Sequence, residues 1–234
     1  MAYLEGKNLV ASYGVVPILH ECSVEVEKGE LAVIVGPNGA GKSTVMRVLL
    51  GMLEATEGSV TLDGKDISML STQDRIAQGL AFVPQTKNVF PSMTVEENLQ
   101  MGGFIREDDI SKTIEEVYEL FPILYEKRKQ LAEELSGGQR QQVAFGRAMM
   151  TRPSVMLLDE PTAGVSPIVM DEIFSNILDV RNAGMAVLMV EQNAQQALNI
   201  ADKGFVLVSG RNEHTGTGKE LIKDREVRKK FLGG

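Results

Sequence analysis

A single cysteine, Cys22, is too few for an internal disulfide. This agrees with a reducing compartment, and the simplest role for Cys22 is that of a small core residue. The sequence also lacks an uninterrupted apolar run long enough to span a bilayer, and its first seven residues lack the charged-then-apolar pattern of a signal peptide. We therefore expect a soluble protein that is not exported.

Positive charge is scarce relative to negative charge. The chain has 24 Lys and Arg residues against 32 Asp and Glu, which gives a formal net charge of −8. This balance provides no electrostatic footprint for nucleic acid and does not favour binding to anionic lipid. A local basic patch is still compatible with it, so the charge argues against nucleic-acid partners without excluding them.

The rest of the composition is that of a globular chain. With 234 residues, 43% of them apolar, the sequence can bury the core of one α/β domain, or of a core with a smaller insert. No internal repeat or low-complexity tract occurs. We therefore searched for the motifs that organise such a domain.

The most informative segment runs from residue 31 to residue 44. Its first part, Leu31 to Val35, is continuously apolar and suits a parallel strand buried on both faces, and a helical pattern begins at Thr44. A strand, a glycine-rich turn and a helix are the context of a phosphate-binding loop. The loop residues are Gly36, Pro37, Asn38, Gly39, Ala40, Gly41, Lys42, Ser43 and Thr44.

Each residue type in this loop has a physical reason to be there. Phosphates must approach bare backbone N–H groups closely, and side chains at Gly36, Gly39 and Gly41 would obstruct them. The helix start adds the positive end of its dipole. Lys42 would place a compact charge on the β- and γ-phosphates, and the Ser43 hydroxyl would coordinate Mg²⁺. The loop predicts nucleotide binding.

Short antiparallel strands are predicted before this loop, at residues 3–10 and 15–28, around a turn formed by Ser12, Tyr13 and Gly14. An aromatic ring upstream of a phosphate loop could stack on adenine. The position of Tyr13 alone favours the alternative, in which it is a tyrosine at the edge of a sheet that only buries apolar surface.

Further strands follow the first helix. Asp63-Gly64 is a hairpin signal, and Leu80 to Val83 form a buried strand that ends at Pro84-Gln85. Gln85 at the carboxyl end of a core strand is well placed to reach a ligand in the crevice of an α/β sheet.

From residue 86 to residue 150 the pattern becomes helical. A capping box is predicted at Thr94 and Glu97, and a helix from Ser111 to Phe121 is closed by Pro122. Because strands return only at Val155, we predict an inserted helical subdomain over 86–150. The core then comprises residues 1–85 and 151–234.

This helical segment ends in Leu135-Ser136-Gly137-Gly138-Gln139, followed by another helical run. Two glycines and a serine at a helix start form an anion site, although a capped helix entry explains the same residues equally well. Two phosphate sites in one chain suggest that two chains share nucleotides.

Two acids, Asp159 and Glu160, follow the apolar run Val155 to Leu158. Acids that follow a buried strand in this way are typical of P-loop proteins, in which Asp159 would orient the Mg²⁺ shell and Glu160 would accept a proton from the attacking water. Successive strand side chains point to opposite faces, so the two acids can serve different partners. The alternative is that both cap a strand in solvent.

The last core strand is predicted at Ala186 to Val190, which places Gln192 at the same crevice, within reach of a γ-phosphate. Residues 205–208 and the Gly210-Arg211 turn predict a final hairpin. Residues 224–231 predict a charged helix that acts as a solvated cap.

Together these motifs resemble the nucleotide-binding subunit of an ABC transporter, over nearly the whole chain. Gly36 to Thr44 is similar to its Walker A motif, Gln85 to its Q-loop glutamine, Leu135 to Gln139 to its signature, and Val155 to Glu160 to its Walker B motif. Tyr13 matches its adenine-stacking aromatic. The resemblance implies an α/β P-loop NTPase core of mostly parallel sheet, with an antiparallel β subdomain and an inserted helical subdomain.

The resemblance also implies an ATPase in which two subunits pack head to tail. Ser136, Gly137, Gly138 and Gln139 would then contact the ATP held by the partner's Lys42 loop. The implied catalytic residues are Lys42, Gln85, Glu160 and Gln192, and the implied Mg²⁺ site comprises Ser43, Gln85 and Asp159.

Two positions depart from the family pattern. Gln192 stands where the family has its switch histidine, and Ser166 stands at the acidic position of the D-loop. A glutamine amide can hydrogen-bond a phosphate but cannot carry the charge of an imidazolium. Hydrolysis at this site could therefore be slower or differently regulated.

Less specific motifs indicate a subfamily of these ATPases. Val190 to Ala194 (VEQNA), Gly164 to Pro167 (GVSP) and Phe90 to Leu99 are similar to ATPase subunits of branched-chain amino acid importers. This implies membrane permease subunits, a homodimer or a heterodimer with a second ATPase, an external solute-binding protein, and a place on the cytoplasmic face of the membrane. The alternatives are a soluble ABC-type ATPase of an assembly complex, an exporter subunit, and a regulatory nucleotide-binding module with little hydrolysis.

Overall fold

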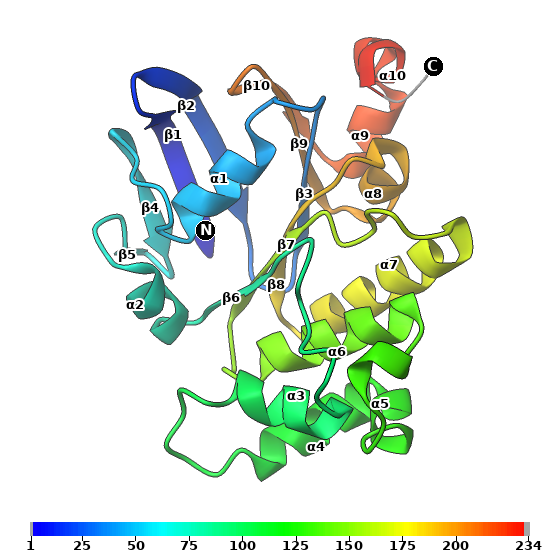
Figure 1. The fold of residues 1–234 in the computed structure, drawn as a ribbon. Helices are drawn as coiled ribbons and strands as arrows, with labels where there is room; N and C mark the ends of the chain where they lie inside the picture. Colours follow the sequence, from blue (N-terminus) through cyan, green and yellow to red (C-terminus); the bar gives the residue numbers. More distant parts are fainter. Residues whose placement is uncertain (1, 232–234) are drawn as a thin grey trace.

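Six strands form the central sheet of the molecule, which we describe from a computed structural model covering residues 2–231 (Figure 1). Their order is β10-β9-β3-β8-β7-β6, and every neighbouring pair is parallel except β9 and β10. The carboxyl ends of β3, β6, β7 and β8 therefore meet at one edge of the sheet. The strands are β3 (Leu31–Val35), β6 (Leu80–Val83), β7 (Val155–Asp159), β8 (Ala186–Val190), β9 (Lys203–Val208) and β10 (Arg211–Gly216).

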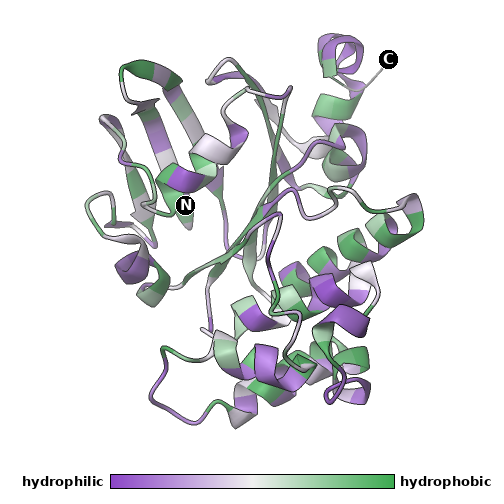
Figure 2. Ribbon diagram, viewed as in Figure 1, coloured by the Kyte–Doolittle hydropathy of each residue, from purple (hydrophilic) through white to green (hydrophobic). Residues whose placement is uncertain are grey.

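The central strands are apolar on both sides because both faces of the sheet are covered. In β3, Leu31, Val33 and Val35 belong to one buried cluster, and Ala32 and Ile34 belong to another on the opposite face. Figure 2 shows hydrophobic colour along these strands, whereas the helices alternate between hydrophobic and hydrophilic residues. The prediction of a parallel strand buried on both faces is confirmed.

A second sheet is antiparallel and has the order β2-β1-β4-β5. Helix α1 (Lys42–Leu49) packs in one apolar cluster with residues of both sheets. The helix after the hairpin is α2 (Thr72–Ala77). The strands of this sheet are β1 (Leu4–Tyr13), β2 (Val16–Val26), β4 (Glu57–Leu62) and β5 (Lys65–Asp66).

The turns of this sheet test two sequence predictions. The Asp63-Gly64 hairpin is confirmed, with φ of 49° and 73°. The first turn was predicted at Ser12 to Gly14, which is wrong by about two residues: Ser12 and Tyr13 pair with β2, and the connection is Gly14-Val15. Gly14, with φ of 65°, supplies the left-handed conformation there.

Residues 86–150 contain helices and the loops that connect them, and the β-pairing in this range is an isolated bridge between Thr94 and Leu131. The capping box of Thr94 and Glu97 is confirmed. Pro122 does end one helix, but it also begins the next, because proline fits the first position of a helix. The division into a separate helical subdomain remains a prediction. These helices are α3 (Val95–Gly102), α4 (Ser111–Leu120), α5 (Pro122–Glu126), the 3₁₀ turn η1 (Ala132–Glu134) and α6 (Gly137–Met149).

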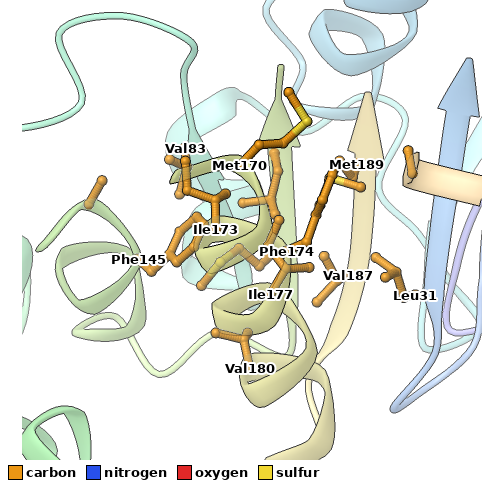
Figure 3. Close-up of a cluster of buried hydrophobic side chains, with 14 of the residues drawn as sticks. Leu31, Val83, Phe145, Met170, Ile173, Phe174, Ile177, Val180, Val187 and Met189 are labelled. Atoms are coloured by element: carbon orange, nitrogen blue, oxygen red, sulfur yellow. The ribbon is translucent and has the colours of Figure 1, made fainter. Parts of the chain in front are cut away.

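Helix α7 (Pro167–Asn182) joins these helices to the central sheet. Figure 3 shows its side chains Ile173, Phe174 and Ile177 between Phe145 of α6 and Val187 of β8. All five are at most 5% exposed. The loop between β7 and α7 is therefore anchored at both ends by buried elements.

Helix α8 (Ala194–Ile200) connects β8 to β9, and the short helices α9 (Gly218–Lys223) and α10 (Arg225–Phe231) follow β10. Val227 of α10 is fully buried in the larger apolar cluster, so the prediction of a solvated cap is wrong for this residue. Met1 and residues 232–234, which belong to the predicted core segments, lie outside the described residues.

Candidate functional site

The glycine-rich loop between β3 and α1 is shaped partly by contacts with its own chain. A side chain at Gly36 would lie 2.2 Å from the carbonyl oxygen of Leu207, and one at Gly41 would meet Leu19 at 2.9 Å. Gly39 faces open space but has φ of 80°. We predicted from the sequence that side chains at these glycines would obstruct the phosphates, and this reason suffices for Gly39. At Gly36 and Gly41 a side chain would also meet other parts of the chain.

Lys42 begins α1 and lies over the loop that precedes it. Its Nζ donates hydrogen bonds to the carbonyls of Gly36 (2.9 Å) and Pro37 (3.2 Å), and the residue is 5% exposed. Burial lowers the pKa of Lys42, and the charges of Glu160, Asp159 and Glu191 oppose that shift. The cation is thus held in place beside the carboxyl ends of β7 and β8.

Ser43 and Asp159 bring two oxygen ligands together from different parts of the chain. The Ser43 hydroxyl donates to Oδ1 of Asp159 at 3.4 Å. Burial, and next the charge of Glu160, raise the pKa of Asp159, while the Ser43 hydrogen bond lowers it. A hydroxyl and a carboxylate are hard oxygen ligands, which fit the preference of Mg²⁺.

Glu160 is the point at which two glutamines meet. Gln85 and Gln192 both donate from Nε2 to Oε2 of Glu160, at 2.9 Å and 2.7 Å. The carboxylate is 8% exposed, and its backbone has φ of 46°, an uncommon conformation for a residue other than glycine. The two acids do contact different partners. Strand alternation is only part of the reason, because β7 ends at Asp159 and Glu160 turns away.

Tyr13 lies at the end of β1 on the rim of the site. Its ring is 45% exposed, and its hydroxyl accepts a hydrogen bond from Arg47 of α1 at 3.2 Å. Arg47, which the sequence analysis did not single out, thus ties the tyrosine to the helix that follows the loop.

Most of these residues, although not Arg47 or Asp159, line one open cleft of about 490 Å³. Gln85 also lines a neighbouring cleft of about 320 Å³ with Ser43 and Asp159, so its side chain borders both clefts. The larger cleft is lined by Tyr13, Ile18, Asn38, Gly39, Gly41, Lys42, Ser43, Thr44, Gln85, Glu160 and Gln192.

The segment from Ser136 to Gln139 does not line this cleft. Ser136 caps α6 and exchanges hydrogen bonds with Gln139, so the capped helix entry considered from the sequence is present. Gly138 packs against Glu172 of α7. A Cβ atom at position 138 would lie 2.5 Å from the carboxylate of Glu172. Within one chain the structure therefore does not bring this segment to the Lys42 loop.

Sequence reasoning missed Glu191. Its carboxylate is 1% exposed and accepts hydrogen bonds from the backbone N–H of Thr162 (3.0 Å) and from the hydroxyl of the same residue (2.8 Å). An acid that follows directly on a buried strand was a usable signal, because Asp159 was recognised in that way.

A phosphate loop, a paired hydroxyl and carboxylate, and a buried glutamate at the carboxyl ends of parallel strands define a P-loop nucleotide-binding ATPase. A sequence profile described as "ABC transporter" matches residues 19–163. The chain belongs to the ABC transporter family and is an ATP-binding subunit with ABC-type ATPase activity. None of the helices within residues 2–231 is both long enough and apolar enough to cross a membrane.

Relatives extend over the full length of the chain. It is 44% identical over 223 residues (95% of this chain, 96% of the relative) to the "High-affinity branched-chain amino acid transport ATP-binding protein BraG" of Pseudomonas aeruginosa. It is 38% identical to the "Probable branched-chain amino acid transport ATP-binding protein LivF" of Archaeoglobus fulgidus, with 97% of each chain covered. It is 34% identical to the "Lipopolysaccharide export system ATP-binding protein LptB" of Haemophilus influenzae, covering 100% of this chain and 98% of the relative.

A solved structure agrees with this assignment. The ADP conformation of MJ1267, an ATP-binding cassette of an ABC transporter, superposes with a TM-score of 0.90 at 31% identity, and all of both chains is covered. The predicted fold class, a P-loop NTPase fold with mixed sheets, is confirmed.

Proposed function

We propose that this subunit powers the import of branched-chain or other hydrophobic amino acids. The observation that carries the proposal is the 44% identity to BraG over 95% of the chain, which the 38% identity to LivF supports. The sequence motif VEQNA at Val190 to Ala194 points to the same group. An exporter subunit is the second candidate, because LptB is 34% identical over the whole chain.

The contacts of the cleft suggest a role for each of its residues. Lys42 would neutralise the β- and γ-phosphates while the N-terminal end of α1 adds its dipole. The Oε1 atom of Glu160 accepts a hydrogen bond from neither Gln85 nor Gln192, so it is the atom that would take a proton from the attacking water. Gln85 and Gln192 would hold that carboxylate in position.

The donor set fits Mg²⁺. Ser43 and Asp159 would hold the ion, with Gln85 beside them in the neighbouring cleft. When bound, the ion would neutralise charge that develops on the phosphates. Tyr13, which is 45% exposed, lies at the rim of the cleft, where its ring could stack on an adenine.

The proposed transporter would need further subunits. Two ATPase subunits would pack head to tail, so that Ser136 to Gln139 of one reach the ATP bound at the Lys42 loop of the other. Such a pair would be a homodimer or a heterodimer with a second ATPase. It would lie on the cytoplasmic face of the membrane, attached to integral permease subunits that receive solute from an external binding protein.

The first test is to tag this chain in its native host, solubilise membranes in mild detergent and identify what co-purifies. Two multi-span proteins together with a second ATPase would support a heteromeric transporter. The complex, reconstituted in liposomes with the neighbouring binding protein, should then hydrolyse ATP faster when leucine, isoleucine or valine is added. The same complex with Lys42→Ala is the control and should neither bind ATP tightly nor respond.

Other outcomes would overturn the proposal. Recovery of soluble partners alone would favour an assembly ATPase. Turnover that responds to lipopolysaccharide and not to amino acids would favour export. Unchanged ATP affinity in Lys42→Ala would contradict the assignment of the loop itself.

A further inference from the structure

Glu191 is a more deeply buried acid than Glu160, and the roles proposed above leave it without one. It follows directly on β8 and is 1% exposed, against 8% for Glu160. Burial raises the pKa of Glu191, and the hydrogen bonds that its carboxylate accepts lower it. A carboxylate buried at this cost needs those hydrogen bonds, so the groups that donate them are held firmly in turn.

The two oxygens of Glu191 serve two different loops. Oε1 accepts both donors of Thr162, which lies two residues after Glu160 in the loop that follows β7. Oε2 accepts the backbone N–H groups of Gln192 (3.0 Å) and Asn193 (3.4 Å) in the loop that follows β8. Asn193 closes the bridge, because its Nδ2 donates to the Thr162 hydroxyl at 3.1 Å.

This bridge forms part of a closed ring that contains the proposed base. Gln192 donates to Oε2 of Glu160, Thr162 follows Glu160 by two residues, and Glu191 joins Thr162 to Gln192. The backbone N–H of Glu160 also donates to the carbonyl of Val190 at 2.9 Å. Movement of either loop would therefore change the contact between Gln192 and Glu160.

We propose that Glu191 is a positioning residue that sets the distance between Gln192 and Glu160 by clamping the loops after β7 and β8 together. The proposal rests on the proposed function of Glu160 as the base in ATP hydrolysis. Thr162 leads into residues 163–166, so the same clamp connects the geometry of the base to that segment. The clamp acts on turnover and leaves the binding of ATP at the Lys42 loop unchanged.

The test uses Glu191→Gln in the full chain, assembled with its native partners. The new amide has one nitrogen, which donates and cannot accept. In one orientation this nitrogen faces the backbone N–H of Thr162, and in the other it faces the backbone N–H groups of Gln192 and Asn193, so a donor meets a donor in both cases. We expect kcat to fall by about tenfold or more, because the clash of two donors pushes the loops apart and misplaces the base. The affinity for ATP should not fall by more than about twofold, because the Lys42 loop keeps its own contacts and the negative charge that is lost, the last of the three that act on Lys42, would repel the phosphates.

Two Thr162 variants make a matched pair. Thr162→Val removes the hydroxyl that donates to Glu191 and accepts from Asn193, and should lower kcat by about three- to tenfold, because two hydrogen bonds of the clamp are lost while the N–H of residue 162 still donates to Glu191. Thr162→Ser keeps the hydroxyl and should behave as the wild type. This pair also answers the question if Glu191→Gln does not fold.

A double-mutant cycle separates positioning from a general loss of stability. If Glu191 acts through Gln192, Glu191→Gln should lower kcat much less in a Gln192→Ala background than in the wild type. Glu97→Gln, which removes a carboxylate that accepts the N–H and hydroxyl of Thr94 away from the cleft, should leave kcat unchanged.

Three results would overturn the inference: wild-type kcat in Glu191→Gln and in Thr162→Val, equal losses in both backgrounds of the cycle, or a loss of ATP affinity that accounts for the lower activity. A wild-type complex that does not hydrolyse ATP would instead overturn the proposed function on which the inference rests.

Discussion

Gln192 donates from its amide nitrogen to Oε2 of Glu160 at 2.7 Å. Since Gln85 donates to the same oxygen at 2.9 Å, one side of the carboxylate is fixed and the other, Oε1, is left to react. Both donors are neutral amides, which do not titrate in the physiological range. The donors that orient Glu160 therefore keep the same charge and the same protons at every physiological pH, whereas a histidine at position 192 would not.

The first prediction concerns Glu160 itself. Glu160→Gln keeps the size of the side chain but removes the proton acceptor, so we expect steady-state phosphate release to fall by about 100-fold or more. ATP should still bind, and a dimer closed on ATP should accumulate, which size-exclusion chromatography with and without Mg²⁺-ATP would detect. Retained turnover would count against Glu160 as the base.

The second prediction separates two glycines of the same loop. Gly39 lines the cleft and faces open space, so Gly39→Ala should cost only about 1–2 kcal/mol of stability from its left-handed backbone. A methyl at Gly36 would meet the backbone carbonyl of Leu207 at 2.2 Å, so Gly36→Ala should cost more than about 2 kcal/mol. Urea denaturation measures both variants.

Nucleotide binding provides the complementary measurement. Gly39→Ala should fold and yet bind ATP about tenfold more weakly, because a side chain there intrudes on the phosphates. Equal stability of the two variants would show that the contact between position 36 and Leu207 does not shape the loop.

The contrast between these glycines shows what the sequence could predict. The loop, the strand before it and the acids after β7 follow from residue types within a few positions of one another. The sequence could not show that Gly36 packs against Leu207, because that contact joins segments far apart in the chain. The same is true of the bridge from Glu191 to Thr162.

Some elements that were not predicted from the sequence carry a pattern that could have predicted them. Helix α9 begins with a capping box of Thr217 and Glu220, the same pattern that correctly predicted α3 at Thr94 and Glu97. The buried state of Val227 could not be read from its own helix, because it depends on packing against the larger cluster.

The third prediction is a pH dependence of stability. The pKa of Asp159 is raised above its usual 3.8, first by burial and then by the charge of Glu160. The folded state therefore holds the proton more tightly than the unfolded state, so ionisation of Asp159 lowers stability as pH rises above 3.8. Asp159→Asn removes this cost.

We expect Asp159→Asn to melt at a higher temperature than the wild type at pH 7, without Mg²⁺ or nucleotide, and to lose Mg²⁺-dependent turnover. The advantage should shrink as the pH falls through 3.8, because below that pH both states of the wild type hold the proton. Thermal unfolding at several pH values measures this. A difference in melting temperature that is constant with pH would show that the variant acts by packing.

The last prediction concerns Arg75, which is 3% exposed and supports the helix that begins at Lys42. Its Nη1 donates to the carbonyls of Val48 and Leu49 at the end of α1, at 2.7 Å and 2.8 Å, and its other nitrogens donate to two further backbone carbonyls. Burial lowers the pKa of this guanidinium, with the charge of Asp66 opposing the shift. Arg75 is therefore the cap of α1, supplied by α2.

Arg75→Met fills similar space but removes four hydrogen bonds to backbone carbonyls, of which that of Val48 alone keeps a backbone donor within residues 2–231, the N–H of Gly51, so we expect a loss of about 2–4 kcal/mol in urea denaturation. Arg211→Met, at an exposed arginine of β10, is the control and should change stability by less than about 0.5 kcal/mol. Because α1 carries Lys42 and Ser43, the folded fraction of Arg75→Met should also bind ATP more weakly. Wild-type stability would show that water satisfies these carbonyls, and that the loop does not depend on the far end of its helix.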